Sequence, residues 1–314
     1  MYPWSDERRF NSYNRFLRQR FGGRIQKLTL DAGFTCPNRD GTVSHGGCAY
    51  CCNDAFNPAY CVPDKSVRQQ LDEGIRFHQR PGTEPAGYFA YVQAFSNTSA
   101  PLPRLKSLYE EALSHPGVCG IVIATRPDCI NTPLLDYLQE LQKRIFVTLE
   151  IGMESCRDAT LRRINRGHDV ACAVRAIEQT SEHHIPVGTH LIFGLPGERP
   201  EQWLEDLSLI NRLPLHSIKF HQLQIIRGTA MEEEYRQHPD EFFALPFDTY
   251  VSFIADYVER LSPNIVIERF AAEVPPRFLA TTGWGGIRYD RVVNAIEAEL
   301  ESRESWQGHK CNQQ

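Results

Sequence analysis

The sequence lacks the hallmarks of several protein classes. Among its 314 residues no run approaches the roughly 20 apolar residues of a membrane-spanning helix, and residues 1–7 contain neither the basic nor the apolar region of a signal peptide. The net charge of −5 excludes a uniformly basic nucleic-acid coat, and 41% hydrophobic residues exclude a disordered or collagen-like chain. We therefore expect a cytoplasmic protein with no membrane partner and a full hydrophobic core.

Short β-branched or aromatic runs alternate with amphipathic helical patterns along the chain. The runs expected to form strands are residues 25–30, 88–92, 120–124, 146–150, 187–193 and 218–223. The patterns expected to form helices are residues 66–79, 102–114, 131–143, 169–183, 200–212 and 247–261. Six strand–helix units predict an α/β fold with a parallel sheet, since right-handed crossovers place the helices outside. Because a closed barrel has eight units, we expect a partial, open (β/α)6 barrel.

The two ends of the chain carry further patterns. Ser5, followed by two acids, predicts a helix start, and Gly22 with Gly23 predicts its end. A run at 265–269 and a helical pattern at 288–303 predict a short C-terminal strand–helix extension. The expected division is an N-terminal basic amphipathic helix, a core domain and a C-terminal extension, at residues 1–19, 20–260 and 261–314.

Half of the ten cysteines fall in one irregular segment after the first expected strand, and the others are scattered singly. The clustered cysteines are Cys36, Cys48, Cys51, Cys52 and Cys61. Eleven residues separate Cys36 from Cys48 and two separate Cys48 from Cys51, so the last two sulfurs can reach one metal centre. A loop at the carboxyl end of a barrel strand lies where barrel enzymes carry their chemistry. Three thiolates suit either zinc, completed by His45 or Cys52, or a [4Fe-4S] cluster with one open iron.

Other polar or glycine-containing segments follow successive expected strands. These are Gln93-Ala94-Phe95-Ser96-Asn97, Thr125-Arg126-Pro127-Asp128, Glu150-Ile151-Gly152-Met153-Glu154-Ser155, Arg163-Ile164-Asn165-Arg166-Gly167-His168 and Gly194-Leu195-Pro196-Gly197-Glu198. With the cysteine loop, and in this order, they resemble the radical S-adenosylmethionine (SAM) superfamily. The resemblance is to the section that includes the elongator catalytic subunit, MiaB and NifB, and most closely to the YhcC/YtqA group. The long first cysteine gap departs from the commonest spacing of the superfamily and is typical of this section.

This resemblance implies iron–sulfur rather than zinc, and with it a mechanism. Cys36, Cys48 and Cys51 are implied as ligands of a [4Fe-4S] cluster, whose open iron is chelated by the amino and carboxylate groups of SAM. An electron from a flavodoxin-like or ferredoxin-like donor breaks the sulfonium C–S bond. The resulting 5′-deoxyadenosyl radical abstracts hydrogen from the substrate, while the protein supplies orientation and exclusion of water.

The residues implied to bind SAM lie mainly at strand ends, where its ammonium, carboxylate and adenine need acceptors, a cation and an apolar surface. They are Gln93, Asn97, Glu150, Arg163, Arg166, His190 and Gly194. Arg163 and Arg166 lie three apart on an expected helix and so share a face. Glu150 ends an otherwise apolar strand, where an unpaired carboxylate is costly to bury. For each residue the alternative is structural: a turn, a solvated helix face or a hydrogen-bonded core histidine.

The distribution of charge and the resemblance both bear on the identity of the substrate. The first thirty residues carry a local excess of basic residues: Arg8, Arg9, Arg15, Arg18, Arg20, Arg24 and Lys27. They predict either a solvated helix face or, with interleaved aromatics, a surface that contacts RNA. The resemblance implies tRNA, at a wobble uridine, as a candidate substrate. Two alternatives are a radical SAM enzyme acting on a small metabolite in cofactor biosynthesis and a zinc-binding interaction protein without catalytic activity. Lys219, His221 and Arg227 are further candidates to face the substrate.

Overall fold

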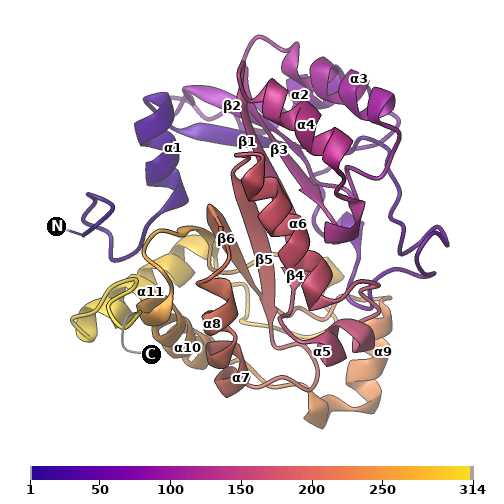
Figure 1. Ribbon diagram of the computed structural model, residues 1–314. Helices are drawn as coiled ribbons and strands as arrows, with labels where there is room; N and C mark the ends of the chain where they lie inside the picture. The colour runs from indigo at the N-terminus through magenta and orange to yellow at the C-terminus, as the bar shows by residue number, and fades with distance from the viewer. Residues whose placement is uncertain (1, 312–314) are drawn as a thin grey trace.

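The computed structural model describes residues 2–311 and contains a seven-stranded sheet (Figure 1). All neighbouring strands pair in parallel and follow one another in chain order. The strands are β1 Ile25–Leu30, β2 Gly87–Val92, β3 Val118–Thr125, β4 Phe146–Glu154, β5 Val187–Phe193, β6 Ser217–Gln222 and β7 Val266–Arg269. The open parallel barrel predicted from the sequence is therefore confirmed. The C-terminal strand also forms, paired with β6 at the sheet edge.

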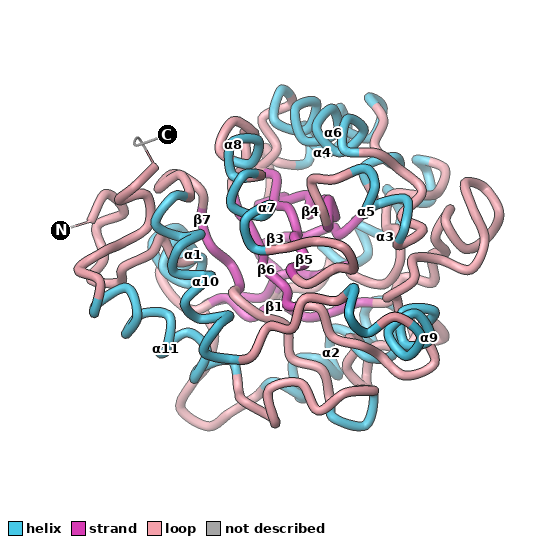
Figure 2. The backbone as a smooth tube through the Cα atoms, turned by 90° about the horizontal axis from the view of Figure 1, so that it is seen from below, coloured by secondary structure: helices cyan, strands magenta, loops and turns pink. Residues whose placement is uncertain are grey.

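Helices surround the curled sheet, which Figure 2 shows in the middle of the molecule. They are α1 Tyr13–Phe21, α2 Val67–His78, α3 Leu102–Leu113, α4 Thr132–Leu141, α5 Asp158–Arg163, α6 Val170–Glu182, α7 Pro200–Glu205, α8 Leu207–Ile210, α9 Ala230–Gln237, α10 Phe247–Arg260 and α11 Tyr289–Ser302. The expected helix at 200–212 is divided at Asp206 into α7 and α8. Crossover helices on the outside leave the inner face of the sheet free to form a site.

The first helix begins later than the sequence predicts. Ser5 has a positive φ of 56° and starts no helix, whereas Ser12 precedes the helix start at Tyr13. The reason is tertiary, because the carbonyl of Asn11 accepts a hydrogen bond from the Ile267 amide of β7 and holds the chain extended. The predicted end is confirmed, since Gly22 adopts the left-handed conformation that glycine favours.

Helix α1 contacts both β1 and β7 and covers the amino-terminal ends of the strands. The Phe21 ring packs 5.2 Å from the ring of Phe89 and 5.7 Å from that of Phe146. Phe16 lies 6.2 Å from Phe146, and Tyr13 is 5% exposed. Tyr13 belongs to the core, and Phe16 and Phe21 are half-buried against it, so these rings are engaged in packing within the chain.

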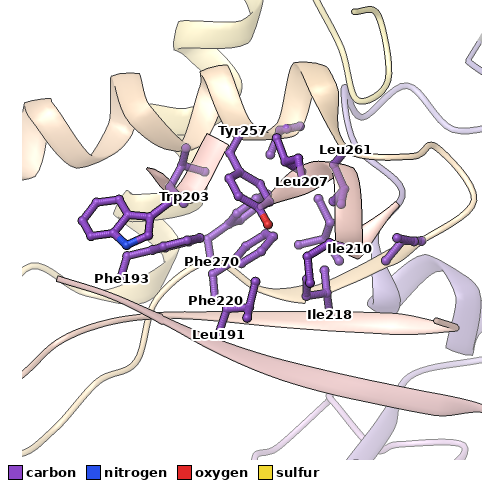
Figure 3. Close-up of a cluster of buried hydrophobic side chains, with 14 of the residues drawn as sticks. Leu191, Phe193, Trp203, Leu207, Ile210, Ile218, Phe220, Tyr257, Leu261 and Phe270 are labelled. Carbon is purple, nitrogen blue, oxygen red and sulfur yellow. The ribbon is translucent and has the colours of Figure 1, made fainter. Parts of the chain in front are cut away.

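The largest core lies between the outer face of β5–β6 and helices α7, α8 and α10, as Figure 3 shows. Its members include Leu191, Phe193, Trp203, Leu207, Ile210, Ile218, Phe220, Tyr257, Leu261 and Phe270. Burying each large apolar side chain stabilises the fold by about 1.5–3 kcal/mol. Side chains alternate along a strand, so this packing turns the intervening residues of β5 and β6 into the barrel.

Candidate active site

A cavity of about 240 Å³ opens at the carboxyl ends of the strands. Its polar lining includes Cys36, Arg39, Cys48, Cys51, Cys52, Tyr91, Gln93, Arg126, Glu150, Glu154, Arg166, His190, Lys219, His221 and Arg269. Ligand sites of parallel barrels lie at this end of the strands, where loops from several strands converge. The cavity is therefore the candidate active site.

The cysteine loop, residues 36–52, brings Cys36, Cys48 and Cys51 to this cavity. The amide of Cys51 donates to the carbonyl of Cys48 over 3.0 Å, which forms the tight turn expected of a two-residue gap. Gly46 and Gly47 have φ values of 80° and 83°, which glycine adopts without strain from a Cβ atom. The long first gap is thus folded back so that the cysteines face one space. Cys52 lines it too.

Hydrogen-bond donors and guanidinium groups surround these sulfurs. The Cys48 Sγ accepts from Nη1 of Arg166 and from Nδ2 of Asn38, each over 3.5 Å. Burial raises the pKa of the Cys51 thiol, and the neighbouring Cys48 adds to this rise, while Arg39 opposes it. Thiolates that open onto one cavity repel one another, so the set favours a positively charged centre between them.

The donor set fits an iron–sulfur cluster. Cys36, Cys48 and Cys51 open onto one cavity. A [4Fe-4S] cluster attaches each thiolate to a different iron, so its cysteines need not converge on one ion. N–H donors to sulfur, as at Cys48, are a known means of tuning such clusters.

Asn165 holds the cysteine loop in place. Its Nδ2 donates to the carbonyls of Gly47, over 2.8 Å, and His45, over 3.2 Å. Its own carbonyl accepts from Nδ2 of Asn38 over 2.5 Å. Asn165 has a φ of 52°, a left-handed conformation that asparagine tolerates better than most residues. The sequence analysis placed this residue in a family segment but assigned it no role.

The two arginines of this segment do not share a face, contrary to the sequence prediction. Helix α5 ends at Arg163, so the helical spacing does not extend to Arg166. Arg163 lies outside the cavity lining and pairs with Glu234, over 2.6 Å, and with Glu241. Arg166 turns into the cavity instead, where its Nη2 lies 3.3 Å from Glu154.

The two polar residues predicted after β2 also separate. Gln93 lines the cavity. Asn97 is fully buried beside the strand ends, and its Nδ2 donates to the carbonyls of Val92, over 3.0 Å, and Ala124, over 2.8 Å. Asn97 therefore joins the ends of β2 and β3 and does not line the cavity, because its amide hydrogens are used by the backbone.

Glu150 is the centre of a buried group of charges inside the barrel. Its Oε1 lies 2.9 Å from Lys27, and its Oε2 lies 2.6 Å from Lys219 and 3.3 Å from His190. Glu268 contacts the same two lysines, at 2.6 Å and 3.1 Å. Burial alone pushes the pKa of Glu150 upward, but Lys219 and Lys27 hold it well below its usual range. We call Lys27, Glu150, Lys219 and Glu268 the central ion cluster.

The remaining predicted residues lie on or beside β5 and β6. His190, Lys219 and His221 line the cavity, as strand alternation requires once the outer face is packed. Gly194 does not line it. This glycine has a φ of 96°, and an added Cβ would lie 3.4 Å from Leu223, so it serves a tight turn after β5. Arg227 is likewise outside the lining and donates to the carbonyl of Leu279.

Sequence reasoning missed several residues of the cavity lining and of the central ion cluster. Lys27 was counted with the N-terminal basic residues, although it points into the barrel. Glu268 and Arg269 lie in the last strand, whose short run revealed little about direction. Arg126 is 2% exposed and is paired with Asp128. The available signal was the presence of charged residues inside otherwise apolar strands, which parallel barrels place in their interior.

Several of the other N-terminal basic residues have partners within the structure. Arg8 and Arg9 pair with Glu297 and Glu301 of α11, at 3.2 Å and 3.8 Å. Arg20 lies over the Phe146 ring, 5.1 Å from its centre. Arg24 donates to the carbonyl of Thr83. Much of the basic excess therefore stabilises local structure.

A parallel open barrel with a three-cysteine loop at the carboxyl end of β1 defines a class of protein. The Radical SAM superfamily model matches residues 38–210, and that of the Radical_SAM C-terminal domain matches residues 215–302. The chain belongs to the radical SAM superfamily.

Three known proteins show what the chain is similar to. It is 37% identical to YtqA of Bacillus subtilis (strain 168), over 98% of this chain and 94% of that protein, which confirms the resemblance to the YhcC/YtqA group. It is 26% identical to the tRNA uridine(34) acetyltransferase of Dehalococcoides mccartyi, over 59% of this chain and 39% of that one. The solved structure of Methanocaldococcus infernus Elp3 shares the fold with a TM-score of 0.64 at 13% identity, covering 91% of this chain and 66% of Elp3. Within residues 2–311 no helix is long and apolar enough to cross a membrane.

Proposed function

We propose that the protein is a radical SAM enzyme that binds one [4Fe-4S] cluster through Cys36, Cys48 and Cys51. The observation that carries this proposal is the opening of all three cysteines onto the cavity at the carboxyl ends of the strands, in a chain of this superfamily. When bound, the cluster and SAM supply one-electron cleavage of the sulfonium C–S bond, which releases methionine and gives a 5′-deoxyadenosyl radical for hydrogen abstraction. A flavodoxin-like or ferredoxin-like protein is the proposed electron donor.

The chain's own residues orient these groups and exclude water. Arg166 and Asn38 donate to the Cys48 sulfur, and Asn165 fixes the loop that carries it. Gln93, Arg166 and His190 are proposed to contact SAM, since they line the same cavity. Glu150 also lines it, but its oxygens are occupied by lysines, so we assign it the placement of those charges. For Asn97, Arg163 and Gly194 we propose supporting roles, because none of them lines the cavity.

We propose tRNA, at a wobble uridine, as the substrate. The similarity to a tRNA uridine(34) acetyltransferase over 59% of this chain supports this choice. A small metabolite of cofactor biosynthesis is the alternative that keeps the same cofactors. The zinc-binding interaction protein is not favoured, because the family match supports a cluster.

The test begins with anaerobic reconstitution of the full chain with iron and sulfide. After reduction with dithionite, wild-type protein is expected to show cluster absorbance and to release 5′-deoxyadenosine from SAM. Cys36→Ser, Cys48→Ser and Cys51→Ser are each expected to lose both signals. Cys172→Ser, which changes a half-buried thiol of α6 outside the cavity lining, is the matched control. A colourless wild-type protein, or a triple serine variant that keeps its cluster, contradicts the proposal.

The substrate is tested separately with bulk tRNA from cells that lack the gene. We expect the reduced enzyme with SAM to change the mass of one nucleoside in that tRNA. If SAM is cleaved but every tRNA nucleoside keeps its mass, the tRNA assignment is wrong and the metabolite hypothesis takes its place.

A further inference from the structure

The side of the cavity formed by β5, β6 and β7 carries a row of basic side chains. His190 of β5 is the register partner of Lys219 of β6, which in turn is the partner of Arg269 of β7. His221 follows two residues after Lys219 and so lies on the same face of β6. All four residues line the cavity. We call them the β5–β7 wall.

Lys219 of this wall has counter-charges in the central ion cluster, whereas Arg269 has none there. The central ion cluster contains two lysines and two glutamates, each within 3.1 Å of an opposite charge, and is balanced. Arg269 is exposed toward the cavity, and within residues 2–311 no carboxylate lies at ion-pair distance from its guanidinium. A guanidinium presents a planar fork of N–H donors that matches phosphate or carboxylate oxygens.

His221 lies beside Arg269 with an unused polar atom. Its Nε2 is buried without a hydrogen-bond partner, although the ring lines the cavity, and the ring centre lies 5.7 Å from that of His190. Buried polar atoms normally have partners, so an orphaned atom at a cavity wall points to a ligand. Burial holds the pKa of His221 well below its usual range, with His190 and Arg269 adding to the effect. The ring is therefore neutral at neutral pH and offers a hydrogen bond rather than a charge.

We propose that the β5–β7 wall is a substrate subsite that binds an anionic group, a phosphate or a carboxylate, through the guanidinium of Arg269 and the imidazole of His221. This inference rests on the proposed function, because only an enzyme has a substrate to bind. It assigns the cofactors to the cysteine loop, with His190 of the wall contacting SAM, and assigns the molecule that is to lose hydrogen to Arg269 and His221. Arg269 is a binding residue in this assignment, and Lys219 is not, because its ammonium already contacts both glutamates.

The test measures binding to the anaerobically reconstituted full chain by calorimetry. The probes are uridine 5′-monophosphate for a phosphate, glutarate for a carboxylate, and uridine as the uncharged control. At least one anion is expected to bind with a Kd of about 1 mM or tighter, and which one does so identifies the group. Uridine is expected to bind about ten-fold more weakly than the monophosphate if phosphate is the group.

Two variants and a control assign the binding to Arg269. Arg269→Gln is expected to weaken the anion about ten-fold or more, and Arg269→Lys to weaken it less, because it keeps the charge but not the fork. Arg18→Gln changes an exposed arginine of α1 and is expected to leave binding unchanged. SAM affinity, measured in the same preparations, is expected to be equal in wild type and Arg269→Gln.

The proposal is overturned if neither anion binds, or if Arg269→Gln binds the anion as tightly as wild type does. A parallel loss of SAM affinity in Arg269→Gln also overturns it, since Arg269 is then assigned to the SAM carboxylate. Release of 5′-deoxyadenosine without any anion is followed separately. Failure of that reaction contradicts the proposed function, whereas failure of anion binding with intact SAM cleavage contradicts the subsite alone.

Discussion

The cysteine loop and the central ion cluster face the same cavity but are held in different ways. The loop is fixed largely by bonds to backbone carbonyls, as Asn165 shows with Gly47 and His45. The ion cluster is fixed by charged side chains, with Glu150 1% exposed between Lys27 and Lys219.

This difference separates two tasks. Hydrogen bonds to carbonyls hold a loop without adding charge, so the sulfurs remain free to take up a charged group. The ion cluster satisfies its own charges and has no capacity left for a ligand. A buried ion network is costly to break, because removing one member leaves its partners buried and unpaired. We therefore expect substitutions in the central ion cluster to have the largest effects on folding stability. Substitutions in the cysteine loop should have the largest effects on the bound iron–sulfur cluster.

Removing the centre of the ion cluster should have the largest effect. Glu150→Ala leaves Lys27 and Lys219 short of a counter-charge, and we expect it to lower the free energy of unfolding by about 3–5 kcal/mol. Glu140→Ala is the matched control, because its pair with Lys143 is exposed and contributes about 0–1 kcal/mol. Urea unfolding of the cofactor-free protein measures both. Equal losses in the two variants would show that the ion cluster contributes no more than a surface pair.

Loosening the loop anchor should act mainly on the iron–sulfur centre. Asn165→Ala removes two donor contacts and places alanine at a positive φ. We expect the reconstituted cluster to be lost to a chelator about ten-fold faster, corresponding to about 1.4 kcal/mol. Asn131→Ala, which removes the side-chain cap of α4, is the control for losing an asparagine elsewhere. If the two variants lose iron at the same rate, Asn165 has no special part in holding the loop.

The difference between local and long-range contacts also explains which features could be predicted from the sequence. The barrel, its C-terminal strand and the cysteine loop were predictable, because strand alternation, helical periodicity and cysteine spacing are local patterns. Gly22 is an example, because this glycine ends α1 by adopting the left-handed conformation that glycine itself favours, without help from distant contacts. The start of α1 was not predictable, because it depends on a hydrogen bond that the Asn11 carbonyl accepts from the Ile267 amide of β7, far away in sequence.

Long-range contacts also account for the misassigned site residues. Lys27 looks like part of a basic N-terminal segment until β7 brings Glu268 beside it. Arg163 and Arg166 share a face only if the helix continues, and it ends at Arg163. The direction in which the side chains of a strand point becomes known once one face of the strand is packed. The core in Figure 3 packs the outer face of β5 and β6 in this way. Sequence alone gave the residue types of the site and not their partners.

The pH dependence of unfolding tests the contribution of His168, which follows two residues after Arg166 in the chain. Burial, with Arg166 adding to it, lowers the pKa of His168 to about 4 in the folded chain. The unfolded chain takes up this proton below about pH 6.5, so stability is fully present above that pH and is lost as pH falls toward about 4. We expect His168→Gln to remove about 2 kcal/mol of the stability difference between about pH 7.5 and pH 5.

The control for that series is His238→Gln, which changes an exposed imidazole at the end of α9. Urea unfolding at each pH measures the effect. An unchanged slope in His168→Gln would mean that the folded protein protonates this ring as readily as the unfolded chain does.

An effect as small as that of Asn165→Ala is expected from the charge beside the sulfurs. Arg166 donates to Cys48 Sγ over 3.5 Å, and a positive group at that place stabilises the cluster more when it is reduced. Arg166→Gln should therefore make the midpoint potential more negative by about 60 mV, which for one electron corresponds to about 1.4 kcal/mol. Arg166→Lys, which keeps the charge, should shift it less. Arg163→Gln is the matched control, because Arg163 lies three residues away and pairs with Glu234 outside the cavity. A redox titration followed by electron paramagnetic resonance measures the midpoint potential of each variant. Equal potentials in Arg166→Gln and Arg163→Gln would show that the charge of Arg166 does not influence the cluster.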